Sequence, residues 1–198
     1  LHLEELLRLA LQHLQQEGRP QRVLDIAAGH GRYVLEALEG APRRPDSILL
    51  RDFSDINVRD GAALIRAKGL QDIARFEQGD AFDPASLAAV TPRPTIGIVS
   101  GLYELFPDND MVRRSLAGLA QAVEPGGYLL YTGQPWHPQL ELIARALTSH
   151  RGGEAWVMRR RSQAEMDQLV DEAGFDKLTQ RIDEWGIFTV SLARRRPA

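Results

Sequence analysis

The stretch that decides the fold is VLDIAAGHGRY, residues 23–33. A short apolar run, residues 22–27, leads into a turn of small residues, and a helix is predicted directly after it, from Gly31 to Leu38. Glycines in such a turn let the backbone approach a ligand closely, and the first amides of the helix point at that ligand. The stretch therefore predicts a strand, a ligand-binding loop and a helix, in that order.

The chain beyond this stretch repeats the alternation of strand and helix. Further strands are predicted at residues 47–50, 73–77, 95–100 and 128–132. Helical spacing of apolar residues predicts helices in the intervening segments that end at Lys68 and at Val123. Strands that alternate with helices form a mainly parallel sheet with helices on both faces. The fold class that we predict is therefore α/β.

The C-terminal segment from Ser162 does not continue this alternation of strand and helix. Ser162 and Glu165 form a capping box, which predicts a helix that extends to Ala173. Two strand-like runs follow, at residues 178–183 and 187–193, joined by only three residues. Because so short a link permits only an antiparallel pair, we predict a C-terminal hairpin.

The first residues predict an amphipathic helix. Leucines and an alanine recur at helical spacing up to Gln16, with charged and amide side chains between them. We expect residues 1–18 to form a helix packed on a domain of residues 19–198. The chain begins with Leu1 instead of Met, which is the pattern of a trimmed chain or of a piece of a longer protein.

Composition excludes several classes of function. The 198 residues carry 24 Lys and Arg against 27 Asp and Glu, and a net charge of -3 argues against broad nucleic-acid binding. There is no cysteine, which excludes disulfides and thiolate metal sites and is compatible with the reducing cytoplasm, where we expect the protein. The five histidines do not fall at metal-ligand spacing, so we predict no metal site. No apolar run reaches the ~20 residues that span a bilayer.

Acidic residues follow the next two predicted strands. Asp52 lies 21 residues beyond Gly31, an offset at which a carboxylate is placed to accept hydrogen bonds from ribose hydroxyls. Asp80 follows the third strand, where an acid and an exposed backbone could read an adenine edge. A dinucleotide fingerprint would need Gly or Ala at Val34, because valine obstructs the close approach of helix and strand. A nucleoside without pyrophosphate fits better, and a nucleotide-dependent oxidoreductase is disfavoured.

Taken together, these segments resemble the class I S-adenosylmethionine-dependent methyltransferases over residues ~20 to 195. The resemblance implies a Rossmann-like, seven-stranded, mostly parallel sheet that ends in an antiparallel hairpin, with S-adenosyl-L-methionine as cofactor. Ala27 departs from the family, which usually has glycine there, and Phe53 is expected either to pack on adenine or to cover the core. The residues that the resemblance assigns to the cofactor are Asp25, Ala27, Gly29, Gly31, Asp52, Phe53, Asp80, Ala81 and Ser100.

Two segments are similar to a narrower group. SGLYELFPDN, residues 100–109, and GQPWHPQ, residues 133–139, resemble methyltransferase domains found behind α/β-hydrolase domains in some bacterial proteins. A fused or neighbouring hydrolase domain is therefore an expected partner. The resemblance does not supply the substrate, for which we expect a small-molecule or lipid-like acceptor. The alternative function is a non-catalytic module that binds an S-adenosyl ligand.

Candidates for chemistry follow the fourth and fifth strands. We expect His137, Tyr103 and Glu104 to be the catalytic residues, with His137 taking a proton from the acceptor as attack proceeds. Trp136 and Tyr103 are expected to wall the acceptor site and exclude water. The basic run at residues 159–161 is interpreted either as a solvated turn or as an electrostatic handle for an anionic acceptor.

Overall fold

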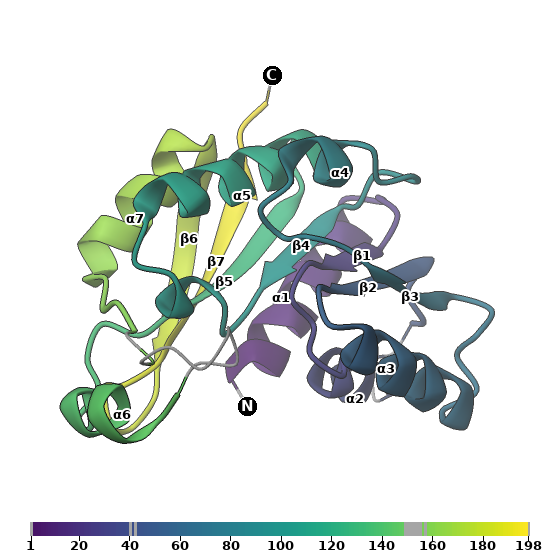
Figure 1. The fold of residues 1–198 in the computed structure, drawn as a ribbon. Coiled ribbons are helices and arrows are strands. Elements are labelled where there is room, and N and C mark those ends of the chain that lie inside the picture. Colours follow the sequence, from purple (N-terminus) through teal and green to yellow (C-terminus); the bar gives the residue numbers. More distant parts are fainter. Residues whose placement is uncertain (1, 40, 42, 149–155, 157, 198) are drawn as a thin grey trace.

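A seven-stranded sheet forms the centre of the chain in the computed structural model, which describes residues 2–39, 41, 43–148, 156 and 158–197. Figure 1 shows the sheet with helices on both faces. The strands, in the order in which they lie side by side, are β3 (Ala74–Gln78), β2 (Ser47–Asp52), β1 (Arg22–Asp25), β4 (Ile96–Val99), β5 (Tyr128–Gly133), β7 (Thr189–Arg195) and β6 (Phe175–Ile182).

The pairing confirms the predicted α/β fold. β1 pairs in parallel with β2 and β4, and the outer pairs β2–β3 and β4–β5 are parallel too. β7 runs antiparallel to β5 and to β6, so the last two strands form the reversed hairpin. The sheet is thus Rossmann-like and mostly parallel, and the carboxyl ends of β1 to β5 lie along one edge.

Two apolar cores lie on opposite faces of the sheet. One core contains side chains of α1 (His2–Gln16), α2 (Arg32–Glu39) and α3 (Asp55–Ala67). The other contains side chains of α4 (Pro84–Ala88), α5 (Asn109–Ala122) and α7 (Gln163–Glu172). Alternate side chains of a strand point to opposite faces, so Leu24 and Val23 of β1 belong to different cores.

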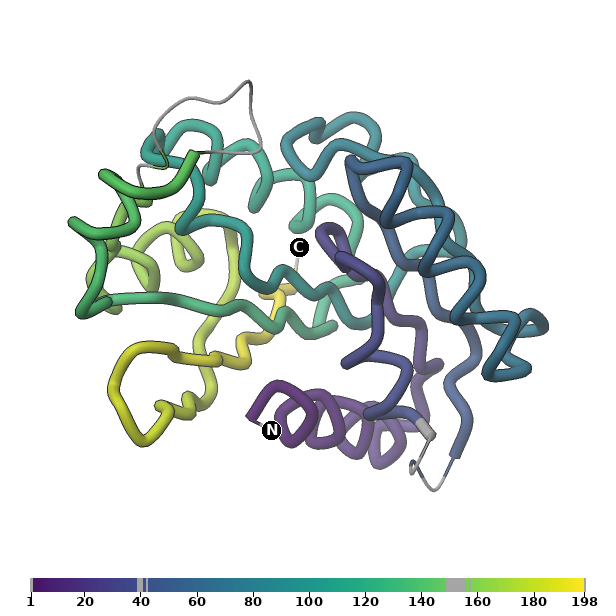
Figure 2. The backbone as a smooth tube through the Cα atoms, turned by 60° about the horizontal axis from the view of Figure 1, so that its bottom comes forward, coloured from purple at the N-terminus to yellow at the C-terminus, as the bar shows by residue number. Residues whose placement is uncertain are grey.

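The first helix buries one of its sides. Five side chains of α1 are buried, namely Leu6, Leu7, Ala10, Leu11 and Leu14. The helix lies against β5, β7 and α2, and Figure 2 shows it beside the C-terminal strand, which is yellow. Arg181 of β6 and Arg194 of β7 form ion pairs with Glu5 and Glu17 at the two ends of the helix.

Element boundaries differ from those predicted by a few residues. β1 ends at Asp25 instead of Ala27, because the next residues already turn toward the glycines, and β2 continues to Asp52. The short helix α4 was not predicted, although Asp83 caps it through the amides of Ala85 and Ser86. α6 (Leu140–Ala146) lies after β5 and has no buried residue.

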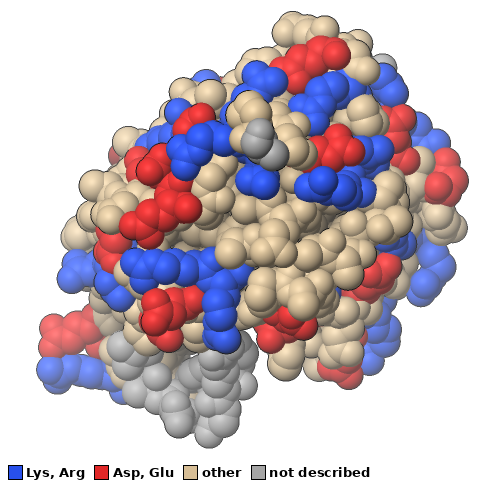
Figure 3. Space-filling view, turned by 90° about the horizontal axis from the view of Figure 1, so that it is seen from above, with Lys and Arg blue, Asp and Glu red and all other residues tan. Residues whose placement is uncertain are grey.

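The surface mixes charges of both signs. On the face seen in Figure 3, Lys and Arg lie among Asp and Glu, without a region of a single sign. Across the part of the chain that the structure describes, no helix is long and apolar enough to cross a membrane.

Candidate functional site

The loop after β1 has two glycines in a left-handed conformation. Gly29 has φ +56° and Gly31 has φ +71°, a region that other residues rarely adopt. A Cβ atom on Gly31 would lie 2.3 Å from Cδ1 of the buried Leu50, whereas a Cβ on Gly29 would meet nothing within 4 Å. Gly31 therefore lets α2 begin directly against β2, and Gly29 borders open space.

Asp52, at the end of β2, ties this loop to the next one. Its Oδ2 accepts the amide N–H of Gly29 at 2.9 Å. Its Oδ1 accepts the amide of Ser54 at 2.9 Å and Nδ2 of Asn57 at 3.1 Å. A carboxylate has about four acceptor positions, so about one remains for a ligand. The neighbouring Phe53 is 74% exposed, which excludes the expectation that it covers the core.

Asp25 lies beneath the loop and has no contact with solvent. Its carboxylate accepts the amide of Ala27 at 3.2 Å and the hydroxyl of Tyr33, and Tyr33 also bonds with Ser100 after β4. Burial raises the pKa of Asp25 from 3.8 to about 7, although the bonds from Tyr33 and Ala27 partly oppose this shift. Asp25 therefore holds the loop from below and links the ends of β1 and β4.

The third loop is positioned by an arginine. The Arg51 side chain is buried, and its Nη2 donates to Oγ of Ser86 at 2.5 Å. A Cβ on Gly79 would lie 2.2 Å from Nη2 of the same guanidinium, so a larger residue there would require the Arg51 side chain to shift. Asp80 is exposed, its Oδ1 accepts the amide of Phe82 at 2.8 Å, and Ala81 is buried below it.

The ends of β4 and β5 meet beside the first loop. The amide of Gly101 donates to Oγ1 of Thr132 at 2.8 Å, and a Cβ on Gly101 would meet nothing within 4 Å. The backbone is thus open to a ligand both at Gly29 and at Gly101, which follow the adjacent strands β1 and β4. In open α/β sheets, ligands bind at this switch point between strands whose connections leave in opposite directions.

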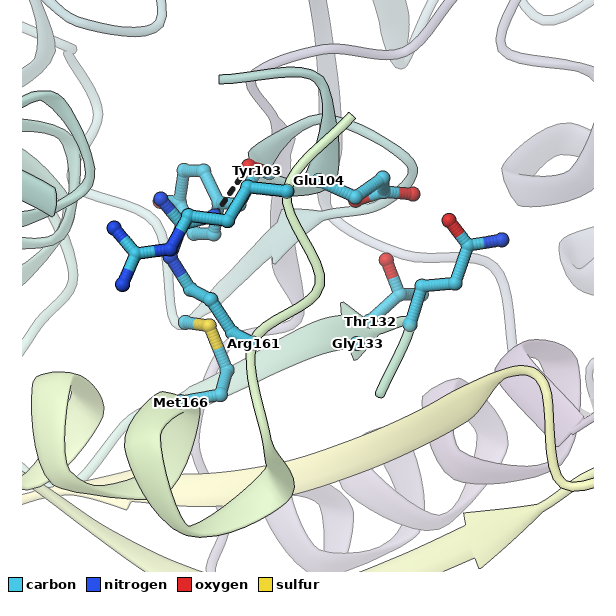
Figure 4. Close-up of a pocket in the computed structure, with 8 residues that line it drawn as sticks. Tyr103, Glu104, Thr132, Gly133, Arg161 and Met166 are labelled. Carbon is cyan, nitrogen blue, oxygen red and sulfur yellow. Dashed lines mark hydrogen bonds between the residues drawn. The ribbon is translucent and has the colours of Figure 1, made fainter. Parts of the chain in front are cut away.

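A small cleft lies on the β4–β5 side of this point (Figure 4). Its volume is ≈ 10 Å³, room for about one water molecule. The residues that line it are Tyr103, Glu104, Thr132, Gly133, Gln134, Arg159, Arg161 and Met166. Two of the three predicted catalytic residues, Tyr103 and Glu104, thus lie together in one cleft.

These two residues differ in what their polar groups contact. The Tyr103 hydroxyl donates to Oγ of Ser115 at 2.9 Å inside the core, and burial raises the pKa of Tyr103. The Glu104 side chain is buried, and its burial raises the pKa of the carboxyl, although a hydrogen bond from its own backbone amide and the charge of Arg161 partly oppose this. The Tyr103 ring can form a wall of the cleft, whereas only Glu104 has a carboxyl group to offer there.

Arg161, the last residue of the basic run, fits neither of the two interpretations of that run. This side chain is 5% exposed and donates to three acceptors of the protein: Oδ1 of Asn109 at 2.7 Å, the carbonyl of Tyr103 at 2.6 Å and the carbonyl of Phe106 at 2.8 Å. The dashed line in Figure 4 marks the bond to Tyr103. Arg161 is therefore neither a solvated residue nor a free handle, because its guanidinium holds the turn after β4.

The loop after β5 carries the other predicted residues. Nδ1 of His137 accepts the amide of Gln139 at 3.1 Å, and His137 is half-buried. Trp136 is 47% exposed, whereas Gln134 is buried and lines the cleft. The structure thus places His137 outside the residues that line the cleft.

Several residues of the site were missed by sequence reasoning. Tyr33, Arg51, Thr132 and Met166 all contact the loops or line the cleft, yet none of them was among the predicted site residues. A glycine directly after β3 was a signal that some large group packs there, but it did not identify Arg51. Among the described residues, no group of three or more His, Cys, Asp or Glu side chains could hold a metal ion.

Comparisons with known proteins show the relatives of this chain. It is 64% identical over 195 residues to the uncharacterized protein YnbC of Escherichia coli (strain K12), an alignment that covers 98% of this chain and 33% of that protein. The chain thus spans about a third of the length of this relative. A SAM-dependent methyltransferase from Methanosarcina mazei has a similar structure, with a TM-score of 0.68 at 19% identity over 90% of this chain and 94% of that one.

A second solved structure is similar over most of both chains. Magnesium protoporphyrin IX methyltransferase from Synechocystis PCC 6803, solved with bound SAH, has a TM-score of 0.69 at 14% identity and covers 97% of this chain and 82% of that one. A protein-family model described as "Putative methyltransferase" matches residues 1–195. Since the match spans nearly the whole chain and the fold agrees with these S-adenosylmethionine-dependent enzymes, the chain belongs to this methyltransferase family.

Proposed function

We propose that the chain transfers the methyl group of S-adenosyl-L-methionine to a small-molecule or lipid-like acceptor. The observation that carries this proposal is the bond between the Gly29 amide and Oδ2 of Asp52, which joins the glycine loop after β1 to the acid after β2. The family match and the methyltransferase fold of the structural relatives support the same activity.

The residues present fit the proposed cofactor. Space is open at Gly29 and Gly101, so a ligand can approach the backbone after both β1 and β4. Asp52 keeps an acceptor position for a ribose hydroxyl, and the exposed Phe53 ring next to it can stack on a base. Exposed Asp80, with Ala81 beside it, can accept from an adenine amino group. Asp25, Ala27, Gly31 and Ser100 would then shape the loop around the cofactor.

Methyl transfer mainly requires the protein to position the acceptor and the cofactor. When bound, S-adenosylmethionine supplies a methyl group on a positively charged sulfur. The chain must hold an acceptor atom in line with that methyl group and exclude water, and orientation alone can supply much of the rate. Tyr103 and Met166 form apolar parts of the cleft wall, while Glu104 and His137 are the candidates to receive a proton.

Two finer features of the proposal rest on the sequence. We propose a cytoplasmic location, supported by the absence of cysteine, which suits a reducing compartment. We also propose a hydrolase domain as a fused or neighbouring partner, supported by the resemblance of residues 100–109 and 133–139 to methyltransferase domains that follow such domains.

Calorimetry with S-adenosylhomocysteine tests the cofactor. The wild type should bind it, and Asp52→Ala should weaken binding by about 1.5–3 kcal/mol, because a hydrogen bond to an ionised carboxylate is lost. Asp60→Ala, which removes a carboxylate paired with Arg59 on α3, is the matched control and should leave the affinity unchanged. Folded wild-type protein that binds neither S-adenosylhomocysteine nor S-adenosylmethionine would refute the proposal.

Turnover separates an enzyme from a binding module. The protein is incubated with cell extract and deuterated-methyl cofactor, and the extract is searched by mass spectrometry for a labelled product. A labelled product that depends on the protein supports methyl transfer. Cofactor binding without any labelled product would favour the non-catalytic module instead.

A further inference from the structure

The cleft beside β4 and β5 contains a carboxyl group that has no partner side chain. Glu104 lies in a short 3₁₀ turn, Tyr103–Leu105, and is 8% exposed. Among the residues that the structure describes, no other side chain forms a hydrogen bond with its carboxylate. Buried carboxylates are ordinarily paired, since an isolated charge is costly away from water. Glu104 therefore has an unused capacity to accept hydrogen bonds inside the cleft.

The two cations at the cleft donate to oxygens of the protein. Three of the five N–H groups of Arg161 do so, as described above. Arg159 donates to the carbonyl of Pro107 at 2.7 Å and to Oε1 of Glu165 at 2.5 Å. A carboxylate or phosphate that entered the cleft would meet the Glu104 carboxylate, which repels it. A neutral group avoids this repulsion and can still donate to Glu104.

The size of the cleft restricts the group that can enter. A volume of ≈ 10 Å³ accommodates one water-sized group, such as a hydroxyl or an amine nitrogen. A phosphate presents at least three oxygens and needs several donors around it. Glu104 provides the acceptor, and Thr132 and Gln134, which line the same cleft, provide polar groups beside it.

We propose that the methyl acceptor presents a neutral hydroxyl or amine to this cleft, and that Glu104 binds this group and takes its proton. This inference rests on the proposed function. As the acceptor atom attacks, a bond forms between this oxygen or nitrogen and the methyl carbon, and the bond from that carbon to sulfur breaks. The sulfur loses its positive charge to become a thioether, and the acceptor proton passes to the Glu104 carboxylate, so charge and atoms balance.

The geometry favours Glu104 over His137 as the proton acceptor. Nδ1 of His137 accepts the Gln139 amide, so the neutral ring carries its proton on Nε2. Neither ring nitrogen then has a free lone pair, whereas both oxygens of Glu104 can accept. A buried carboxyl with a raised pKa is also a stronger base than an exposed one.

Three probes of similar shape test the inference. Benzyl alcohol, aniline and benzoate, the first two neutral and the third an anion at about pH 8, are titrated into wild-type protein saturated with S-adenosylhomocysteine, and binding is followed by ligand-observed NMR. The alcohol and the amine should bind at least tenfold more tightly than benzoate. Glu104→Gln should bring the difference below threefold, because the repelling carboxylate is gone. Glu141→Gln on α6, which removes an exposed carboxylate paired with Arg145, is the matched control and should retain the wild-type preference.

The outcomes separate this inference from the function on which it rests. Absence of S-adenosylhomocysteine binding contradicts the proposed function itself. If S-adenosylhomocysteine binds, three results would overturn the inference alone. These are benzoate binding as tightly as the alcohol, no binding of the alcohol or amine, and an unchanged preference in folded Glu104→Gln. If that variant does not fold, a pH titration of the wild-type protein tests the inference instead. Its preference for benzyl alcohol over benzoate should shrink when the pH is lowered to about 5, where more of the Glu104 carboxyl is protonated, and an unchanged preference overturns the inference.

Discussion

Alanine substitutions at Gly31 and Gly29 are expected to have different costs, although both glycines lie in the same loop. Both have positive φ, so alanine at either position incurs the left-handed cost of about 1–2 kcal/mol. Only at Gly31 would the new Cβ also collide, at 2.3 Å, with Cδ1 of Leu50. Leu50 is fully buried and has little room to move, so overpacking adds about 1–3 kcal/mol. We therefore expect Gly31→Ala to lose about 2–5 kcal/mol of unfolding free energy and Gly29→Ala about 1–2 kcal/mol.

A double variant identifies the collision as the cause. Leu50→Ala removes the atoms in contact and should by itself cost about 2–5 kcal/mol, as a cavity does in a close-packed core. Combined with Gly31→Ala, it should cost about 1–2 kcal/mol less than the sum of the two single variants, because the new methyl group occupies part of the cavity. The same combination with Gly29→Ala should be additive, since nothing lies within 4 Å of a Cβ there.

Urea unfolding followed by circular dichroism measures these free energies. Calorimetry with S-adenosylhomocysteine on the folded variants then shows which changes also affect the ligand. Equal losses for the two single glycine variants would refute the reasoning, because they would mean that Leu50 does not restrict this loop. Additivity of Gly31→Ala with Leu50→Ala would refute it in a second, independent way.

Three further predictions follow from buried groups and from composition. Burial raises the pKa of Asp25 from 3.8 to about 7, so the folded protein binds a proton that the unfolded chain releases. The resulting stabilisation is present in acid and is lost as the pH rises from about 4 to 7. Urea titrations should show the wild type losing stability relative to Asp25→Asn across this window, and parallel curves would contradict the assignment. Arg161→Met should destabilise the fold by about 2–4 kcal/mol, since two buried carbonyls and Asn109 lose their donor, whereas Met at the exposed Arg160 should change the melting temperature little. Once an acceptor is identified, methyl transfer should persist in chelator, and loss of activity that Mg²⁺ restores would contradict this.

The alternation of strands and helices was predictable because it depends on local patterns. Short apolar runs that alternate with helical patterns predict a parallel sheet, and two strand-like runs joined by a short link predict a terminal hairpin. In the structure this link comprises residues 183–188. α4 escaped prediction because five residues give no helical period to detect. Its cap, Asp83, is a signal that many turns share.

The individual contacts of the candidate site were much less predictable. A run of three arginines is indistinguishable by sequence from a solvated turn, and only the tertiary structure brings Arg161 against the carbonyls of Tyr103 and Phe106, 58 and 55 residues away. The same holds for Tyr33 and Arg51, because the sequence does not indicate that their side chains contact Asp25 and Ser86. Burial of Glu104 was also contrary to the usual expectation for an acid in a loop.

The acids of the loops have two roles that compete for the same oxygens. Asp25 uses both carboxylate oxygens on Ala27 and Tyr33, and Asp52 uses three of about four acceptor positions on its own loops. Loops that hold one another in this way need little reordering when a ligand arrives, which lowers the entropic cost of binding. It also follows that weaker ligand binding in an acid-to-alanine variant is not by itself proof of a direct contact. A ribose contact at Asp52 requires the loss of affinity to exceed what the accompanying loss of stability in the loop can explain. Asp25 is fully buried beneath the loop, so its replacement should lower affinity only as far as it loosens the loop.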